Sequence, residues 1–255
     1  MINYIIRRGA TLSLIGASVL SLGLFNLKAL ALPTEEVVKQ LNPVPVFTVA
    51  DEEGKPLVAK GQDQDNEVNI TNVFLSQKDA SEFVTQVQSK YPDLEKKVRV
   101  LPVPLGEIYK LAIENLEKEN LKFAYVPNKT AVNDAKTVEG ATYEGGVPLF
   151  VATSGEDQGY VTVEKDSQQI IPFFFEKSQV EKMVTQFKDQ QPDLASSVSI
   201  QVVPLELIIE DLHSRDDEDL SKIVLVPSSE SIEFIQNSAA SQQAAPATQQ
   251  APAKK

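Results

Sequence analysis

An internal repeat with a spacing of 100 residues constrains the fold of this chain more than any other feature. The repeat keeps an unbroken register from Phe74 to Pro127 and from Phe174 to Pro227. One matching pair arises easily by chance, but a register of this length indicates that a structural unit has been duplicated. The matching segments are Val84-Thr85-Gln86 with Val184-Thr185-Gln186, Pro92-Asp93-Leu94 with Pro192-Asp193-Leu194, Val103-Pro104-Leu105 with Val203-Pro204-Leu205, and, at a slightly longer spacing, Val44-Pro45-Val46-Phe47 with Val147-Pro148-Leu149-Phe150.

Each copy predicts the same order of elements, β-β-β-α-β-α-β. Short apolar runs bounded by turn residues predict the strands, and apolar residues at helical spacing predict the helices. The fold class is therefore α+β, a tandem duplication of this lobe with two mixed sheets related by a pseudo-two-fold axis and helices packed on them. The predicted strands are residues 44–49, 57–59, 70–75, 98–101 and a strand ending at 126 in the first copy, and residues 147–152, 160–163, 170–175, 198–203 and a strand ending at 226 in the second.

The sequence indicates where the first helix of each copy begins and where it ends. Ser178 to Glu181 has the capping-box pattern, in which the serine caps the helix and the acid reaches back, and Ser76 is the corresponding cap in the first copy. Both helices must end before Pro92 or Pro192, because the residue before a proline disfavours the helical conformation. A second helix follows the Val-Pro-Leu motif of each copy.

The sequence pattern divides the chain into four segments. Residues 1–31 are a signal peptide, and residues 32–143 form the first lobe together with a short amphipathic helix at Pro33–Leu41. Residues 144–236 form the second lobe, and residues 237–255 form a tail of Ser, Gln, Ala and Pro. The tail has too few large apolar side chains to offset chain entropy, so we predict that it is disordered.

The first 31 residues have the pattern of a cleavable secretory signal. Arg7 and Arg8 precede an apolar run, and Ala29-Leu30-Ala31 provides the small–x–small pattern that signal peptidase recognises. The run is short for a membrane span of about 20 residues, which favours cleavage over an uncleaved anchor. No later apolar run is long enough to cross a bilayer, so the mature chain is predicted to be soluble, with no integral membrane segment. Export without cysteines fits a bacterial periplasm or a lumen derived from one.

Composition excludes several classes of function. The formal net charge is −12, and no basic stripe suited to nucleic acid is present. The chain has no cysteine, and His213, its one histidine, lies in a charged run typical of a solvated helix end. The acidic segment at residues 63–67 lacks the turn glycine and the terminal glutamate of a calcium loop. We therefore predict no catalytic residue, no cofactor and no metal site.

The second predicted helix of each copy has more apolar residues than one buried stripe needs. Leu207 lies off the stripe formed by Leu205, Ile208 and Leu212, and Phe173 begins a run of three phenylalanines. Two interpretations stay open, ordinary core with inter-lobe packing, or an apolar groove that binds polypeptide. Under the second interpretation, the candidate client-binding residues are Leu105, Ile108, Leu111, Leu205, Leu207, Ile208 and Phe173.

Three features taken together resemble a known family. They are the signal peptide, the segment Leu41-Asn42-Pro43-Val44-Pro45-Val46-Phe47, and the segment Gly145-Gly146-Val147-Pro148-Leu149-Phe150 at the start of the second copy. With the duplicated order, these features resemble the Tic22-like family, the small soluble component associated with the translocon of the inner chloroplast envelope. The resemblance covers about residues 35–236, and the short low-complexity tail favours a cyanobacterial member.

The resemblance implies a soluble chaperone-like factor that guides precursor or outer-membrane polypeptides between membranes. In a cyanobacterium it would work in the periplasm or the thylakoid lumen, and the family offers no catalytic residues to carry over. The alternative is a scaffold or adaptor that docks a translocon or an outer-membrane assembly machine through its acidic exterior. An enzyme is a minor third hypothesis, because the polar residues form no converging constellation. Suppression of client aggregation by the purified protein alone would distinguish the first hypothesis from the second.

Overall fold

The computed structural model describes residues 4–6, 32–63, 66–91, 98–115, 121–138, 140, 142–155, 157–215 and 217–243. The predicted signal peptide lies outside these residues except for β1 (Tyr4–Ile6), a short strand antiparallel to β8. The tail beyond Gln243 also lies outside them.

The observed order of elements confirms the predicted repeat and adds a helix at the end of each copy. The short helix predicted ahead of the first copy is present as α1 (Thr34–Leu41). The first copy contains β2 (Pro45–Asp51), β3 (Ala59–Asp63), β4 (Asn66–Phe74), α2 (Gln77–Lys90), β5 (Val98–Pro104), α3 (Leu105–Asn115), β6 (Leu121–Val126) and α4 (Lys129–Ala135). The second copy contains β7 (Pro148–Ser154), β8 (Gly159–Lys165), β9 (Gln168–Phe174), α5 (Lys177–Gln190), the 3₁₀ helix η2 (Pro192–Ser197), β10 (Ser199–Pro204), α6 (Leu205–Ser214), the 3₁₀ helix η3 (Leu220–Lys222), β11 (Ile223–Val226) and α7 (Ser229–Gln243).

The two sheets repeat one another in strand order and register. Strands β5, β2, β4 and β6 lie side by side in the first sheet, as β10, β7, β9 and β11 do in the second. The last strand of each set is parallel to its neighbour and the other pairs are antiparallel, so both sheets are mixed. The pair Phe47 and Phe74 in the first sheet matches Phe150 and Phe174 in the second. The fold is therefore the α+β duplication that the sequence predicts.

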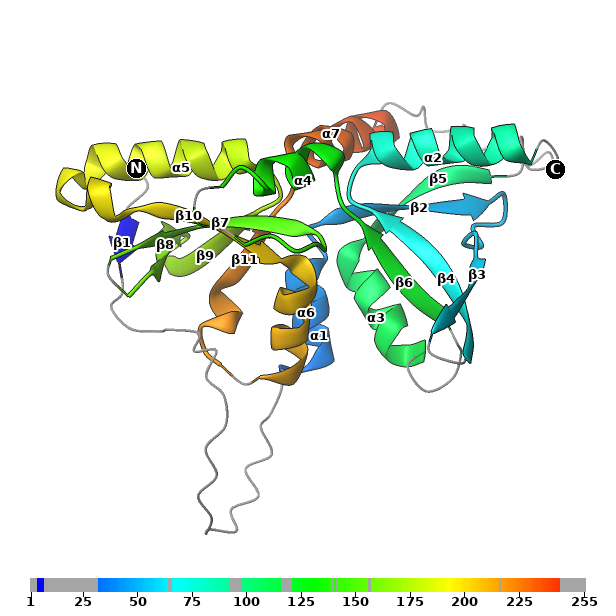
Figure 1. Cartoon of the computed structure of the whole chain (residues 1–255), viewed down its shortest axis with the longest axis horizontal. Helices are drawn as coiled ribbons and strands as arrows, with labels where there is room; N and C mark the ends of the chain where they lie inside the picture. The colour runs from blue at the N-terminus through cyan, green and yellow to red at the C-terminus, as the bar shows by residue number, and fades with distance from the viewer. Residues whose placement is uncertain are drawn as a thin grey trace, which may run out of the picture.

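The molecule has three layers, with both sheets in the middle (Figure 1). Helices α5, α4, α7 and α2 lie above the sheets in this view, and α6, α1 and α3 lie below. Side chains alternate between the layers along each strand. Leu149 and Val151 of β7 join the lower core, whereas Phe150 and Ala152 join the upper one.

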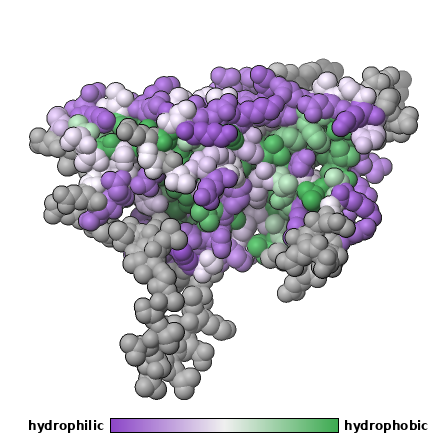
Figure 2. Space-filling view, viewed as in Figure 1, coloured by the Kyte–Doolittle hydropathy of each residue, from purple (hydrophilic) through white to green (hydrophobic). Residues whose placement is uncertain are grey.

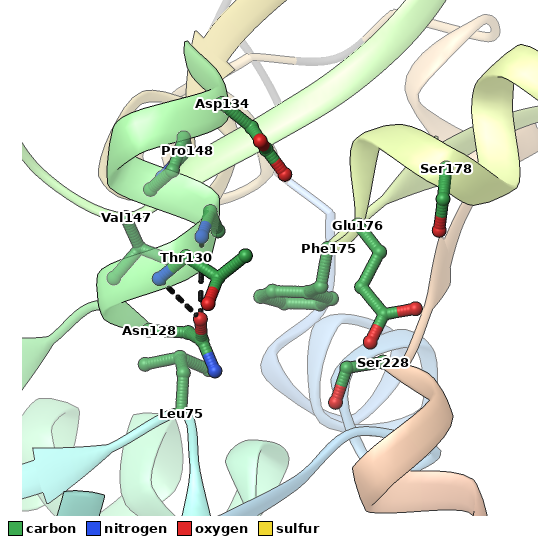
Figure 3. A pocket seen from close by; sticks show the side chains of 11 residues that line it. Leu75, Asn128, Thr130, Asp134, Val147, Pro148, Phe175, Glu176, Ser178 and Ser228 are labelled. Carbon is green, nitrogen blue, oxygen red and sulfur yellow. Dashed lines mark hydrogen bonds between the residues drawn. The ribbon is translucent and has the colours of Figure 1, made fainter. Parts of the chain in front are cut away.

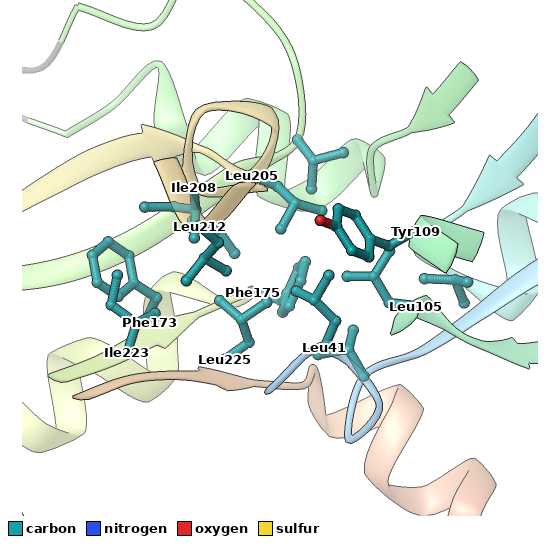
Figure 4. Packing of buried hydrophobic residues seen from close by; sticks show 14 of the residues in the cluster. Leu41, Leu105, Tyr109, Phe173, Phe175, Leu205, Ile208, Leu212, Ile223 and Leu225 are labelled. Atoms are coloured by element: carbon teal, nitrogen blue, oxygen red, sulfur yellow. The ribbon is translucent and has the colours of Figure 1, made fainter. Parts of the chain in front are cut away.

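The lower core is continuous across both copies (Figure 4). Val37 and Leu41 of α1 pack there with Leu105 of α3 and Leu205 of α6, and all four side chains are fully buried. Helix α1 therefore fills the space between the copies. Its Gln40 amide Nε2 also donates to the backbone oxygens of Leu220 and Ser221 in the second copy.

The last helix of each copy packs on the sheet of the other copy. Helix α4, from the first copy, places Ala131 and Ala135 in the upper core of the second sheet. Helix α7, from the second copy, places Phe234 edge-on against Phe47 of the first sheet, with ring centroids 5.2 Å apart. The Glu230 carboxylate of α7 also accepts hydrogen bonds from the Ser76 hydroxyl and the Lys78 backbone N–H. The copies thus exchange their terminal helices.

The structure corrects three details of the sequence prediction. Ser76 caps α2, since its hydroxyl accepts from the Asp79 N–H at 3.2 Å, but α5 begins at Lys177, before the predicted cap Ser178. Strand β3 spans Ala59–Asp63 rather than residues 57–59, and the segment before it makes an isolated bridge at Pro56, which has no N–H to extend a ladder. Helix α7 continues to Gln243, past the predicted start of the tail at 237, through Ala and Gln residues that favour helix.

Candidate binding site

The first copy contains an apolar groove on the upper face of its sheet. The groove lies between α2 and strands β2, β3 and β4, and its cavity is about 310 Å³. Asn72 is the one polar side chain in the lining, apart from the hydroxyl of Tyr91. The lining residues are Val49, Leu57, Val58, Ala59, Ile70, Asn72, Phe83, Val87 and Tyr91.

Two side chains at the rim of this groove are exposed. Val58 is 42% exposed and Tyr91, which follows the last residue of α2, is 59% exposed. Figure 2 shows hydrophobic residues gathered below α2, over the strands of the first copy, while the upper helices present a hydrophilic surface. An apolar hollow with exposed apolar rim residues can receive apolar side chains of another molecule.

The groove is open because α2 has smaller or less deeply placed side chains than its counterpart α5. Helix α5 buries Val180, Met183, Val184 and Phe187 against the second sheet. In α2, Ala80 is the buried residue, while Phe83, Val84 and Val87 are half-buried. At the position after the helix, Tyr91 replaces Gln191. A comparison of the two repeats, residue by residue, could have identified this difference from the sequence.

Five of the seven residues proposed from sequence as client contacts lie in the lower core. Leu105, Ile108, Leu205, Ile208 and Phe173 are buried and packed together there (Figure 4). The Phe173 run needs no exposed ring, because both faces of the second sheet are covered and successive side chains enter opposite cores.

The other two predicted contacts are on the surface. Leu111 of α3 is 42% exposed and Leu207 of α6 is 51% exposed. Their exposure agrees with the position of Leu207 off the buried stripe of its helix. Both helices belong to the lower layer, so these residues do not line the groove above the first sheet.

Polar contacts near the two lower helices join the copies. The Tyr109 hydroxyl and His213 Nδ1 are 3.0 Å apart, which connects α3 to the exposed last turn of α6. Burial raises the pKa of the Tyr125 hydroxyl to about 12, and the nearby Glu206 carboxylate adds to the shift. Tyr125 therefore stays protonated at neutral pH, where a useful general base or acid needs a pKa near 7. The Tyr125 hydroxyl can hydrogen-bond but is poorly suited to acid–base catalysis.

Within the described ranges, no group of three or more His, Asp or Glu side chains could hold a metal ion. The same residues include no helix that is both long enough and apolar enough to cross a membrane. The features of the molecule that stand out are thus an apolar groove and an acidic composition.

The comparisons with known proteins agree with this duplicated architecture. The model of the Tic22-like family matches residues 14–237, most of the chain. The chain belongs to the Tic22-like family. The structure titled "Anabaena Tic22 (protein transport)" superposes with a TM-score of 0.71 at 26% identity, over 81% of this chain and 97% of that one.

Other members of the family are more distant in sequence. Tic22 from Plasmodium falciparum has the same fold, with a TM-score of 0.63 at 19% identity over 80% of this chain and 98% of that one. "Protein TIC 22, chloroplastic" of Pisum sativum is 22% identical over 202 residues, which are 78% of this chain and 75% of the pea protein. The duplicated fold is thus shared with relatives of low sequence identity.

Proposed function

We propose that this Tic22-like protein is a chaperone-like protein-transport factor that binds extended precursor or outer-membrane polypeptides. Its membership of the family and the protein-transport title of the Anabaena relative support this class of function. The observation on which the proposal rests is the open apolar groove of the first copy, because the helix residues that match its lining, Met183 and Phe187, are buried in the second copy.

The groove suits apolar side chains of an extended client. Its volume of about 310 Å³ lies at the lower end of the ~300–1,000 Å³ typical of ligand sites. Transfer of apolar surface out of water stabilises such a complex by roughly 25 cal/mol per Å² before ordering costs. The near absence of polar lining groups means that binding depends little on the client's sequence, as a factor for many precursors requires.

The proposed location is the periplasm or the thylakoid lumen of a cyanobacterium. The secretory pattern of residues 1–31 and the lack of cysteines support an exported chain. The proposed partners are precursor polypeptides in transit, and the net charge of −12 would keep the unloaded protein from self-association.

The test is suppression of aggregation of an unfolded model client by the purified protein. The double variant Val58→Thr/Tyr91→Gln gives the groove rim the residues of the matching positions in the second copy. Tyr91 matches Gln191, and Val58 matches Thr162, because each precedes the residue that pairs with the matched isoleucine, Ile70 or Ile170. Because both side chains are exposed, we expect the variant to fold with a stability within about 0.5 kcal/mol of the parent and to lose most of its client protection. Ile235→Gln is the matched control, since Ile235 is 45% exposed on α7 and does not line the groove. Equal protection by the double variant and the parent would contradict binding at the groove.

A second pair of variants tests the exposed leucines of the lower layer. Leu111→Lys and Leu207→Lys each place a charge where an apolar contact would leave it desolvated. If these variants fold but lose protection while the groove variant keeps it, the client surface is the lower layer.

The scaffold alternative is supported by the acidic composition of the chain. A scaffold would dock on a translocation or assembly machine through charged groups, so added salt would weaken that binding. Binding of a client in the apolar groove would not be weakened by salt. Absence of any client protection by the parent protein, together with salt-sensitive binding to a membrane complex, would favour the scaffold.

A further inference from the structure

A second cavity lies where the two copies meet, between the first turns of α4 and α5 and the start of α7 (Figure 3). Its volume is about 320 Å³. Residues at equivalent positions of the repeat line it in pairs, Leu75 with Phe175 and Asn128 with Ser228. The cavity is therefore built by both copies.

The inner part of this cavity is apolar. Leu75 and Phe175 are buried side chains that also belong to the lower core, and Val147 and Pro148 at the start of β7 complete this surface. The ring of Phe175 lies in the middle of the space that the labelled residues surround (Figure 3). A hydrocarbon chain inserted here would contact apolar groups along its length.

Two carboxylates from different elements line the same cavity. Asp134 extends from α4 toward the space above the Phe175 ring, and Glu176 extends from the residue before α5 toward Ser228 (Figure 3). The Glu176 oxygens accept from the Ser229 N–H and hydroxyl at 3.0 and 2.7 Å, at the positive end of the α7 dipole. Its charge is thus partly compensated within the protein.

Asp134 has no such compensation among the described residues. It lies in the last turn of α4, where the helix dipole is negative and disfavours an acid, and that turn contains no basic residue. Lys129 pairs with Asp79 and Glu82, and Lys177 pairs with Glu181; Lys136, the exposed C-cap residue of α4, makes no ion pair with Asp134 among the described residues. A cation supplied from outside would therefore find an unneutralised carboxylate facing an apolar cavity.

We propose that this junction cavity binds the side chain of a lysine or arginine of a bound polypeptide. The aliphatic stem of such a side chain would pack on Leu75 and Phe175, and its charged head would reach Asp134. The inference rests on the proposed function for its occupant, because the side chain belongs to a client. It adds a preference for basic segments to a groove that has no charge selectivity of its own.

The test uses two capped alanine pentapeptides, one with lysine and one with norleucine at the centre, titrated into the full-length mature protein. Norleucine keeps the aliphatic stem and removes the charge, so the pair isolates the contribution of the cation. We expect the lysine peptide to bind ~5-fold more tightly, with backbone amide NMR shifts at Ala131 and Asp134. Asp134→Asn should remove that preference. Asp189→Asn, an exposed acid on α5 that does not line the cavity, should retain it.

Equal affinities of the two peptides, or an unchanged preference in Asp134→Asn, would overturn the proposal. Tighter binding of the norleucine peptide would overturn it too, and would make the cavity a purely apolar site. The proposed function fails separately, since it requires the groove variant Val58→Thr/Tyr91→Gln to lose client protection. A parent that prefers lysine at the junction without protecting any client would support this inference and contradict the chaperone role.

Discussion

The upper faces of the two sheets are covered differently by the matched helices α2 and α5. In the second copy, α5 buries four apolar side chains against the sheet, Met183 and Phe187 among them, and the hollow of about 460 Å³ on that face lies elsewhere, between α5 and the start of β10, with two lysines in its lining. In the first copy, α2 leaves the corresponding positions, Phe83 and Val87, half-buried beside an open groove. The same fold thus occurs twice in the chain, with different packing of the helix on its upper face. The copies differ in the side chains of that helix rather than in strand order or register.

This difference indicates a division of roles after duplication. A sheet covered on both faces contributes stability, because its apolar area is removed from water. A sheet with an incompletely covered face gives up part of that stability and keeps an apolar surface for another molecule. The predictions below test whether the second copy stabilises the fold and the first copy binds.

The largest expected effect is in the second copy, where α5 packs closely on its sheet. Phe187→Ala should lower the free energy of unfolding by about 3–5 kcal/mol, because the ring is fully buried and its removal leaves a cavity. The matched variant Val87→Ala should cost only about 1 kcal/mol, since Val87 is half-buried at the groove. Denaturant unfolding of both variants measures the difference. Equal losses would mean that the two copies share the stabilising role.

The next effect concerns the matched positions 106 and 206, at the start of α3 and α6. A Cβ added to Gly106 would collide with the Val38 carbonyl and the Asn42 side chain of α1. Gly106→Ala should therefore cost about 1–3 kcal/mol by displacing α1. Glu206, at the matched position, instead accepts a hydrogen bond from the Val147 N–H at 3.0 Å, and Glu206→Gln keeps an acceptor there. Unfolding curves that place Glu206→Gln below Gly106→Ala would contradict this assignment.

Val87→Phe copies the closed helix into the open copy. The larger side chain should fill the groove, change stability by less than about 1.5 kcal/mol, and reduce client protection strongly. Melting temperature and aggregation assays on the same preparation separate the two effects. Full protection in a folded Val87→Phe variant would show that the groove is not the binding surface.

The smallest effect at neutral pH is expected at Tyr125, which matches the fully apolar Leu225 of the second copy. Because burial raises the folded-state pKa of Tyr125 to about 12 from an ordinary value near 10, its contribution to stability is complete below pH 10. That contribution is lost as the pH rises from 10 through 12. Tyr125→Phe should leave stability unchanged at pH 8 and reduce the loss between pH 10 and 12. An identical alkaline loss in the variant would contradict the assignment to Tyr125.

The sequence predicted the elements well because their signals are local. Short motifs indicate where helices and strands begin and end, to within a few residues. They are the Val-Pro-Leu motifs, the prolines after the first helices and the Ser76 cap. Which face a side chain occupies is a non-local property. Leu105, Ile108 and Phe173 looked like surplus apolar surface because their partners, on α1 and the facing copy, are far away in sequence. Helix α4, with seven residues, was too short to predict from periodicity, and the sheet that it covers depends on how the copies pack.

The exchange of terminal helices sets the order in which the chain can fold. Phe47 of the first sheet is covered by Phe234, and Ser76 bonds to a residue 154 positions away. The upper face of the second sheet is covered by α4, which precedes that sheet in the chain, and by α5 of the same copy. As the polypeptide emerges, the upper face of the second sheet can therefore be covered once β11 has formed, while that of the first sheet stays incomplete until the next element, α7, follows. Contacts of such long sequence separation slow folding and link both copies into one cooperative transition. Folding of the first copy is therefore complete only when the C-terminal helix α7 has packed on its sheet.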